Sequence, residues 1–292
     1  SASGRILNTP SSDLVLVFYS LADFRAWRES IPKERSVTLV PTMGALHEGH
    51  AQLIRDASTT ADETIVTIFV NKIQFTNQSD YDKYPRTTES DLRIAEESGA
   101  TVVLIPSDDD MTPLLSGNTI SAGTIGQLWE GVDRPGHFDG VLTVVNQLFR
   151  LTNPHRARFG EKDRQQLIII TEWARTAWPA ITIDRGSTVR DADGLALSSR
   201  NRRLNSTGRV AALTLSRALR AMKDAVTAGV TGSREIEAKG RAVVSASCEV
   251  HYLAIVDGRT LQPQGTVDQN SVALIAATVD GVRLIDNVDL YS

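Results

Sequence analysis

Cysteine is almost absent from this chain of 292 residues, because Cys248 is the only one. A lone cysteine excludes an intramolecular disulfide, so the fold must be held together by its core, and this composition fits a reducing compartment. Long hydrophobic runs are also missing, since the longest, 14–19 and 167–170, are far shorter than the roughly 20 residues that span a membrane. The first dozen residues lack the basic start and apolar stretch of a signal peptide. We therefore expect a soluble, cytoplasmic protein with no membrane partner.

A strong charge of one sign is lacking as well. The chain has 31 Lys and Arg against 35 Asp and Glu, a formal net charge of −4 that is spread without long blocks. A nucleic-acid-binding protein normally shows a net basic face, so the charge argues against that class. A local cluster of cations would still suit small anionic substrates. Hydrophobic residues make up 41% of the chain, which allows a substantial core in one large or two medium domains.

The first two thirds of the sequence contain a βαβ rhythm. Short, nearly continuous apolar runs predict buried parallel strands at 37–40, 64–70, 102–105 and 181–183. Amphipathic segments between them predict helices at 50–61, 89–98, 141–151 and 167–177. This alternation predicts a doubly wound, Rossmann-like α/β domain over residues 1–187.

The rhythm changes after Asp184, where residues 185–187 suit a hinge. Beyond it the pattern predicts two helices and then three strands, at 206–228, 233–247, 250–256, 272–278 and 282–285. The Asp280-Gly281 pair between the last two strands predicts a hairpin turn. We expect residues 188–292 to form a smaller α+β domain that serves as a lid.

Residues 40–50, VPTMGALHEGH, are the most informative stretch. A buried strand is expected to end at Pro41, two glycines free the loop, and His50 is expected to open a helix. Ligands of open α/β sheets bind at the carboxyl ends of strands, where a helix start offers free backbone N–H groups to phosphate. His47 and His50 could instead be metal ligands or helix-surface residues, but no third ligand with suitable spacing is evident. The position favours phosphate binding.

Three later segments carry polar side chains that suit anions and hydroxy acids. The amides of Asn71 and Gln74 follow an apolar strand and could hold carboxylate and hydroxyl groups, or could simply end the strand. Lys162 sits at an expected helix start and could neutralise phosphate, while residue 163 could bind a ribose hydroxyl or cap the helix. The hydroxyls of residues 198–199 beside Arg200 make an anion clamp or a solvated loop.

Taken in order, these segments resemble the pantothenate synthetase family. The HEGH sequence at 47–50 resembles the HxGH motif of the nucleotidyltransferase superfamily, and the preceding PTMG makes it similar to the pantothenate synthetase version. Further similar segments are FVNKIQF at 69–75, DKYPR at 82–86, WEGVDRPGHF at 129–138, FGEKDRQQL at 159–167 and VRDADGLALSSRN at 189–201. Their joint occurrence is more specific than any one of them.

The resemblance implies a ligase that adenylates pantoate with ATP and Mg²⁺, then joins it to β-alanine, releasing AMP and pyrophosphate, in a homodimer. The implied catalytic residues are His50, His47 and Lys162. The implied ATP-binding residues are Met43, Gly44, His47, His50, Gly160, Lys162, Asp163, Val189, Leu197, Ser198, Ser199 and Arg200. Pantoate would be bound by Pro41, Met43, Asn71, Gln74 and Gln166. β-Alanine would be bound by Gln74, Arg134 and His137.

The sequence departs from the family pattern at four positions, where Lys72 replaces proline, Thr112 and Arg164 replace tyrosine, and Leu197 replaces methionine. We expect residue 164 to face away from the chemistry. One alternative is a nucleotidyltransferase that leaves AMP on its acceptor, and another is a paralog that binds ligand without turnover. Product analysis separates the first alternative from a synthetase, and the intact histidine pair argues against the second.

Overall fold

The computed structural model describes residues 5–6 and 15–291, and these residues form two compact units. The first unit contains the described residues up to Gln127, together with Gly131–Glu161 and Ile169–Ser187. The second contains Leu128–Glu130, Lys162–Ile168 and the described residues from Thr188 onward. Two short segments that precede residue 188 in the sequence therefore belong to the second unit.

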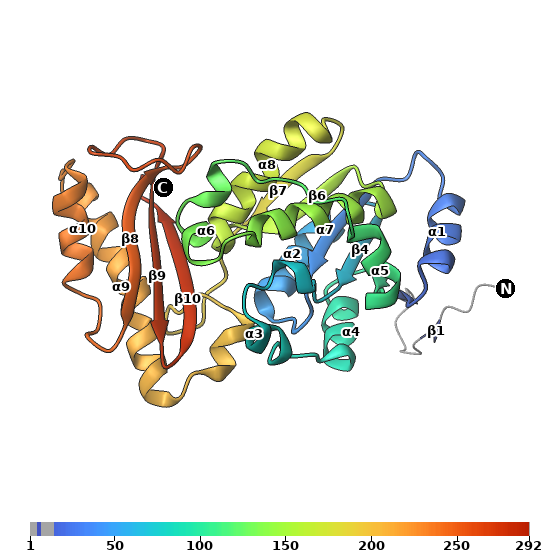
Figure 1. The fold of residues 1–292 in the computed structure, drawn as a ribbon, viewed down its shortest axis with the longest axis horizontal. Coiled ribbons are helices and arrows are strands. Elements are labelled where there is room, and N and C mark those ends of the chain that lie inside the picture. The colour runs from blue at the N-terminus through green and yellow to red at the C-terminus, as the bar shows by residue number, and fades with distance from the viewer. Residues whose placement is uncertain (1–4, 7–14, 292) are drawn as a thin grey trace. The chain divides into compact units, whose positions relative to one another are not determined.

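A seven-stranded sheet forms the centre of the first unit (Figure 1). Its strands are β1 (Arg5–Ile6), β2 (Leu16–Phe18), β3 (Val37–Thr42), β4 (Glu63–Ile68), β5 (Val102–Leu104), β6 (Arg156–Gly160) and β7 (Thr182–Gly186). Their order in the sheet is β1-β2-β5-β4-β3-β6-β7, and every neighbouring pair except β1–β2 is parallel. The doubly wound α/β fold is thereby confirmed, and the strand order reverses between β3 and β6, where ligands of such sheets bind.

Helices connect these strands, and α2 carries the histidine motif. The helices are α1 (Leu21–Ser30), α2 (Glu48–Ser58), α3 (Gln78–Asp82), α4 (Thr88–Glu97), α5 (Asp108–Leu115), α6 (Glu130–Asp133), α7 (His137–Thr152) and α8 (Arg164–Ala177). We expected His50 to open the second of these, but the helix begins at Glu48 and His47 is its N-cap. The expectation was wrong because a histidine side chain provides the cap.

The buried faces of α2 and α4 share one hydrophobic cluster with the central strands. Ile54 and Ala57 on α2 are fully buried and pack with Val40 of β3 and Val66 of β4. Leu46, in the loop between β3 and α2, belongs to the same cluster and is 1% exposed. The loop that carries the histidine motif is therefore attached to the core at its last residue before the N-cap.

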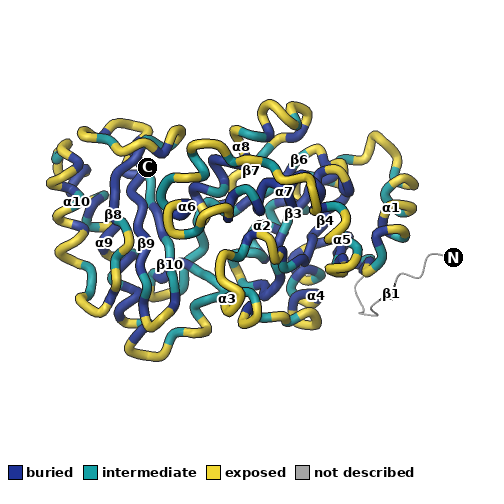
Figure 2. The backbone as a smooth tube through the Cα atoms, in the orientation of Figure 1, coloured by how far each residue is buried: buried dark blue, intermediate teal, exposed yellow. Residues whose placement is uncertain are grey.

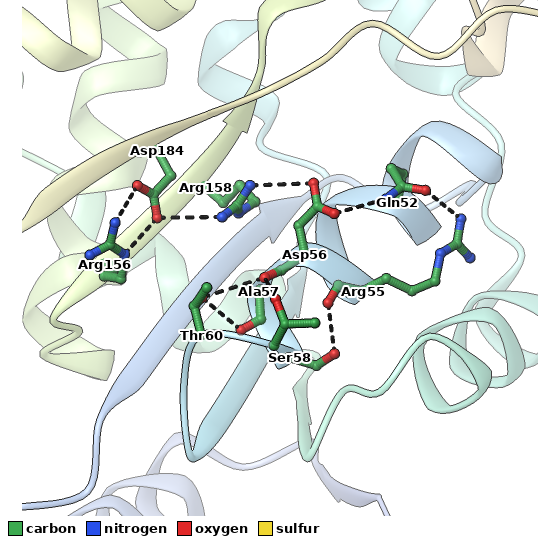
Figure 3. Close-up of polar contacts among 10 residues, drawn as sticks. Gln52, Arg55, Asp56, Ala57, Ser58, Thr60, Arg156, Arg158 and Asp184 are labelled. Atoms are coloured by element: carbon green, nitrogen blue, oxygen red, sulfur yellow. Dashed lines mark hydrogen bonds and ion pairs between the residues drawn. The ribbon is translucent and has the colours of Figure 1, made fainter.

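An ion-pair network ties the middle of α2 to β6 and β7 (Figure 3). Arg158 lies between two carboxylates, with Nη1 3.3 Å from Asp56 Oδ2 on the helix and Nη2 3.7 Å from Asp184 Oδ2 on β7. Arg156 approaches the same Asp184 at 2.8 Å, and Gln52 donates to Asp56 at 2.8 Å. Because Arg158 and Asp184 are mostly buried, this network is screened less by solvent than a surface ion pair.

The second unit is an antiparallel sheet covered by two helices. Its sheet has the order β10-β9-β8, and its elements are η4 (Ser199–Arg203), α9 (Ser206–Thr227), α10 (Ser233–Arg241), β8 (Glu249–Asp257), β9 (Ser271–Val279) and β10 (Val282–Asp289). The middle strand β9 is buried along almost its whole length (Figure 2). The expected hairpin turn is confirmed, because Asp280 and Gly281 both have positive φ, 53° and 71°. Helix α10 ends at Arg241, six residues before the end of the helix predicted at 233–247.

No helix among the described residues is both long and apolar enough to cross a bilayer. The 22-residue α9 is amphipathic, with Leu215, Leu219 and Met222 on its buried face. These side chains form the core of the second unit with β-strand residues such as Ala273 and Ile275.

Candidate active site

The loop that leaves β3 turns sharply through two left-handed residues. Gly44 has φ +78° and Ala45 has φ +51°. A Cβ atom added at Gly44 would lie 3.0 Å from Asp91 Oδ2 and 3.1 Å from Ile68 Cγ2. The positive φ of residue 44 and the lack of space around its Cα therefore both require glycine at this position. The turn brings residue 47 to the start of α2, at the carboxyl end of the central strand, where the sheet order reverses.

Both imidazoles of the motif accept hydrogen bonds from the backbone at the start of α2. The Gly49 N–H donates to Nδ1 of His47 at 3.1 Å, and the His47 N–H donates to Nδ1 of His50 at 3.2 Å. Together they form a capping box in which histidine takes the place of the usual hydroxyl and carboxylate. The ring centroids are 4.2 Å apart and the rings are inclined by 48°.

These bonds determine the tautomer of both rings. A neutral imidazole has one donor nitrogen and one acceptor nitrogen, so Nδ1 as acceptor places the proton of His47 and of His50 on Nε2. The pair therefore presents Nε2–H donors, the form suited to an anionic oxygen.

The backbone N–H groups of the loop, which we expected to bind phosphate, have hydrogen-bond partners within the protein. The Ala45 and Leu46 N–H groups donate to Asp91 at 3.0 and 2.8 Å, and that of Gly44 donates to Thr42 Oγ1 at 3.2 Å. The N–H groups of residues 47 and 49 are used by the rings. Phosphate binding at this loop stays a prediction, and the Nε2–H groups of the two imidazoles are further candidate donors for an anion.

A second polar group follows β4. The Asn71 side chain, 1% exposed, donates to Gln74 Oε1 and to the Gly140 carbonyl, both at 3.1 Å. Its own Oδ1 is buried and has no hydrogen-bond partner among the described residues. Leaving a buried acceptor unpaired costs roughly 1–3 kcal/mol, which a ligand hydroxyl would recover. Gln74 Nε2 approaches the Met43 sulfur at 3.1 Å, so the two loops that follow β3 and β4 meet here.

His137 has the tautomer opposite to that of the motif histidines. Its Nδ1 lies 2.7 Å from the Gln74 carbonyl oxygen, which can only accept, so Nδ1 carries the proton and Nε2 is the acceptor of the neutral ring. The ring is 6% exposed at the first turn of α7. Arg134 is half-buried, and its carbonyl accepts the His137 N–H at 3.1 Å. A Cβ at Gly140 would lie 2.7 Å from the Ile73 carbonyl oxygen, so glycine permits this close packing.

The departures Lys72 and Thr112 lie on the surface. The Lys72 ammonium lies 5.8 Å from the centre of the Tyr81 ring, and Arg86 lies 5.0 Å from the same ring. The short turn η1 (Lys72–Gln74) forms without the proline of the family pattern. Thr112 is exposed on α5. Neither substitution disturbs the contacts of the amide pair.

Of the remaining candidate residues, Pro41 on β3 and Gly160 on β6 belong to the first unit. The others belong to the second unit, where β10 holds the segment around Lys162. Asn287 Nδ2 donates to the Lys162 carbonyl at 2.9 Å, and Arg164 pairs with Asp289 at 2.7 Å. The arginine that replaces the family tyrosine therefore attaches the first residue of α8 to β10. Gln165 is buried and bonds to the backbone of 128–130, whereas Gln166 is half-buried.

The same strand holds the loop that contains the Ser-Ser-Arg sequence. Asp286, 6% exposed, accepts two hydrogen bonds from Arg190 at 2.6 and 2.9 Å. Leu197 N–H donates to the Val189 carbonyl at 3.0 Å, which closes the loop just before residue 198. Ser198 then caps η4 by accepting the Arg200 N–H at 3.2 Å, so its hydroxyl proton is still a donor.

A second ion pair braces this loop against α9. Arg209 donates to Asp191 and to Asp193, in each case at 2.7 Å. These side-chain hydrogen bonds, that to Asp191 first, raise the pKa of Arg209 above its ordinary value.

Sequence reasoning missed Asp91, Asp286, Asn287 and Asp289. Asn287 contacts the candidate Lys162, and the other three contact segments that carry candidate residues, all across long separations in the sequence. The adjacent polar residues Asp286 and Asn287 directly follow the predicted strand 282–285, which is the one signal that the sequence offers for them. No group of three or more His, Cys, Asp or Glu in the described part of the chain is arranged to hold a metal ion.

Gly49→Ala tests the positioning of the His47 ring. An added Cβ would lie 2.9 Å from His47 Cε1 and 3.0 Å from its Nδ1, so the ring must shift. A displacement of about 1 Å can cost ~10²-fold in rate, and we expect a loss of this order in the ligase activity implied by the resemblance, in purified folded protein. Gly265→Ala, where an added Cβ meets open space, is the matched control and should keep its rate. Equal rates in the two variants would contradict this role of Gly49.

Asn287→Ala tests whether β10 places Lys162. Loss of the hydrogen bond to the Lys162 carbonyl should raise the KM for ATP several-fold while the KM for the acid substrate stays the same. Ser271→Ala removes buried hydrogen bonds of the same unit to Gln264 and Asp268, so it controls for stability. An unchanged KM for ATP in the Asn287 variant, or an equal rise in the Ser271 variant, would contradict the assignment.

Comparison with known proteins identifies the family to which the chain belongs. Residues 16–289 match the family model described as pantoate-beta-alanine ligase. The chain is 47% identical over 264 residues to the pantothenate synthetase of Rubrobacter xylanophilus, covering 87% of this chain and 91% of that protein. The crystal structure of pantothenate synthetase from Thermus thermophilus matches with a TM-score of 0.88 and 37% identity, covering 94% of this chain and 99% of that one.

A second solved structure carries ligands in its description. The pantoate-beta-alanine ligase of Francisella tularensis, complexed with beta-gamma ATP and beta-alanine, has a TM-score of 0.80 and 32% identity over 95% of this chain and 98% of that one. Family model, relatives and structures all cover nearly the whole chain. The chain therefore belongs to the pantoate–β-alanine ligase family.

Proposed function

We propose that this chain condenses (R)-pantoate with β-alanine in two steps, through a pantoyl adenylate. A free carboxylate does not react with an amine, so the pantoate carboxylate first attacks the α-phosphorus of ATP and pyrophosphate leaves. The β-alanine amine then attacks the acyl carbon, AMP leaves, and the amine loses a proton. Family membership supports the reaction, and the observation that carries the mechanism is the Nε2–H tautomer of both motif histidines.

In the first step His47 and His50 donate from Nε2 to oxygens of the transferring phosphoryl group. Preorganised donors of this kind are each worth roughly 3 kcal/mol in the transition state, because their orientation is fixed before charge develops. The backbone bonds at Nδ1 fix the orientation here. Lys162 and Arg200, with the hydroxyls of residues 198–199, neutralise the triphosphate. The nucleotide is further contacted by Met43, Gly44, Gly160, Asp163, Val189 and Leu197.

Pantoate is held by Asn71, Gln74 and Gln166, with Pro41 and Met43 beside it. The unpaired Asn71 Oδ1 accepts a hydrogen bond from a pantoate hydroxyl, which removes the cost of a buried unsatisfied acceptor. Gln74 is already oriented by Asn71 and by the Met43 sulfur, so little side-chain entropy is lost when the substrate binds.

β-Alanine is bound through both of its ends. Arg134 pairs with its carboxylate, and Gln74 contacts it beside pantoate. The neutral His137 ring donates from Nδ1 to a carbonyl, so Nε2 is the atom that accepts a proton from the attacking amine. This role requires the tautomer opposite to that of the motif histidines, which is the one that the Gln74 carbonyl favours.

Four finer features belong to the same proposal. Mg²⁺ would enter the site with ATP and would supply positive charge to the phosphates. Since Mg²⁺ is usually bound by phosphates and few carboxylates, the lack of a three-ligand cluster in the described residues is compatible with it. Residues 1–187 bind ATP and pantoate, and residues 188–292 act as a lid, because an adenylate hydrolyses in water.

The enzyme is a homodimer in the cytoplasm, where the free Cys248 stays reduced.

The decisive assay measures AMP and pyrophosphate release from ATP and Mg²⁺, with pantoate and β-alanine added separately and together. Pantoate alone should release pyrophosphate stoichiometrically with the enzyme, and AMP should accumulate only when both substrates are present. A stable adenylylated product in place of free AMP would show a nucleotidyltransferase. Nucleotide binding without any turnover would show a paralog that only binds ligand.

His50→Ala should lower the single-turnover rate of pantoyl adenylate formation by ~10²–10³-fold, the usual cost of losing one transition-state donor. His155→Ala is the matched control, because that imidazole also accepts a backbone N–H through Nδ1, from Val37 at 3.0 Å, but belongs to no motif. A near-normal adenylation rate in His50→Ala would rule out the proposed role of this ring.

A further inference from the structure

Asp91 is a buried carboxylate on α4 that serves the loop after β3. The residue is 1% exposed. Its Oδ2 accepts the Ala45 N–H at 3.0 Å, and its Oδ1 accepts the Leu46 N–H at 2.8 Å and the Thr87 hydroxyl at 3.0 Å. None of these three partners is a cation. A buried carboxylate without a cation is costly, so its presence here calls for a physical reason.

The loop offers this carboxylate an anion-binding concavity. Consecutive backbone N–H groups in a left-handed turn converge on one point and bind anions. Here Gly44 and Ala45 have the left-handed φ values, and the two following N–H donors converge on Asp91. The Asp91 carboxylate therefore takes the place of an external anion at these two donors.

Two neighbours of Asp91 give up stability to maintain this arrangement. Thr87 is the N-cap of α4, yet its hydroxyl makes no capping bond and donates instead to Asp91. A capping bond is typically worth ~1 kcal/mol. Ala45 has φ +51°, a conformation that costs about 1–2 kcal/mol for a residue with a Cβ. The missing capping bond of Thr87 and the left-handed φ of Ala45 are both explained if the Asp91 contacts fix the conformation of the loop after β3.

We propose that Asp91 is a positioning residue for the histidine pair. The loop that it holds is the only covalent link between β3 and the N-cap of α2. Without the carboxylate, Ala45 relaxes out of the left-handed region, and the backbone that leads into His47 moves. His47 and His50 then lose the shared capping box and, with it, the fixed Nε2–H tautomer. The catalytic consequence of this inference rests on the proposed function, but the structural consequence does not.

The test compares Asp91→Ala, Asp91→Asn and Thr87→Val with Glu63→Gln. The first two remove the carboxylate, and the third removes only the hydroxyl that orients it. Glu63 is the matched control, because it is a buried carboxylate of the same unit, 8% exposed, at the amino end of β4, where it contacts Arg35 and Thr101. Thr87→Val keeps the test open if the Asp91 variants fold poorly. Thermal unfolding of each variant records how much stability is lost.

Histidine ¹⁵N NMR gives a readout that does not depend on activity. In the wild-type chain His47 and His50 should both show the Nε2–H tautomer with a hydrogen-bonded Nδ1. Asp91→Ala and Asp91→Asn should convert these signals to a mixture of tautomers, Thr87→Val should do so in part, and Glu63→Gln should leave them unchanged. Unchanged histidine signals in folded Asp91 variants would overturn the proposal, whatever the enzyme does.

Single-turnover pyrophosphate release, with ATP, Mg²⁺ and pantoate, provides the catalytic readout. We expect a loss of roughly 10²-fold in the Asp91→Ala variant with the pantoate Kd unchanged, and partial, saturable recovery of the rate on adding formate, which fits the vacated concavity. The same loss in Glu63→Gln at equal thermal stability would overturn the specific role. If the wild-type chain itself released no pyrophosphate, the proposed function would fail, and the NMR result would still decide the role of Asp91.

Discussion

Two hydrogen bonds from the backbone to imidazole nitrogens at the start of α2 are the interactions on which the rest of the site depends. Each bond satisfies a backbone N–H group that has no partner inside the helix, and it also fixes which nitrogen of the ring is protonated. The same two bonds therefore stabilise the start of the helix and orient the rings for an anionic oxygen. A serine or aspartate cap would satisfy the helix equally well, but it would present no Nε2–H donor.

The parts of the fold that the sequence predicts well are those in which local pattern and burial agree. The runs at 37–40 and 64–70 form strands that are buried on both faces, so they are nearly continuous in apolar residues and identify β3 and β4. The helix start at Glu48 was misplaced because histidine ranks low among N-cap residues, and only the structure shows that its ring accepts the bond. The short strand β2 at Leu16–Phe18 was noted only as an apolar run, since three residues carry too little pattern to assign.

The site could be named from its motifs but not assembled from them. The motif residues at 43–50 and 71–74 lie where the strand order predicts, after the carboxyl ends of β3 and β4. What the sequence did not reveal is how the backbone donors of the loop are used. That depends on Asp91, which lies 45 residues beyond Leu46 and carries no motif of its own. Contacts of this separation leave no periodic signal in one sequence, so they are seen only in the folded structure.

Strand β10, near the C-terminus, makes further contacts that link residues far apart in the sequence and that no motif predicts. Asp286, Asn287 and Asp289 are successive polar residues that bond to Arg190, Lys162 and Arg164 respectively. Because one short strand makes all three contacts, the spacing between the Lys162 segment and the loop before Ser198 follows from the geometry of that strand. The replacement of the family tyrosine by Arg164 is then accommodated by an ion pair to Asp289, without altering the bond to Lys162. The motif residue Lys162 therefore belongs to the second unit, in which it is bonded to β10.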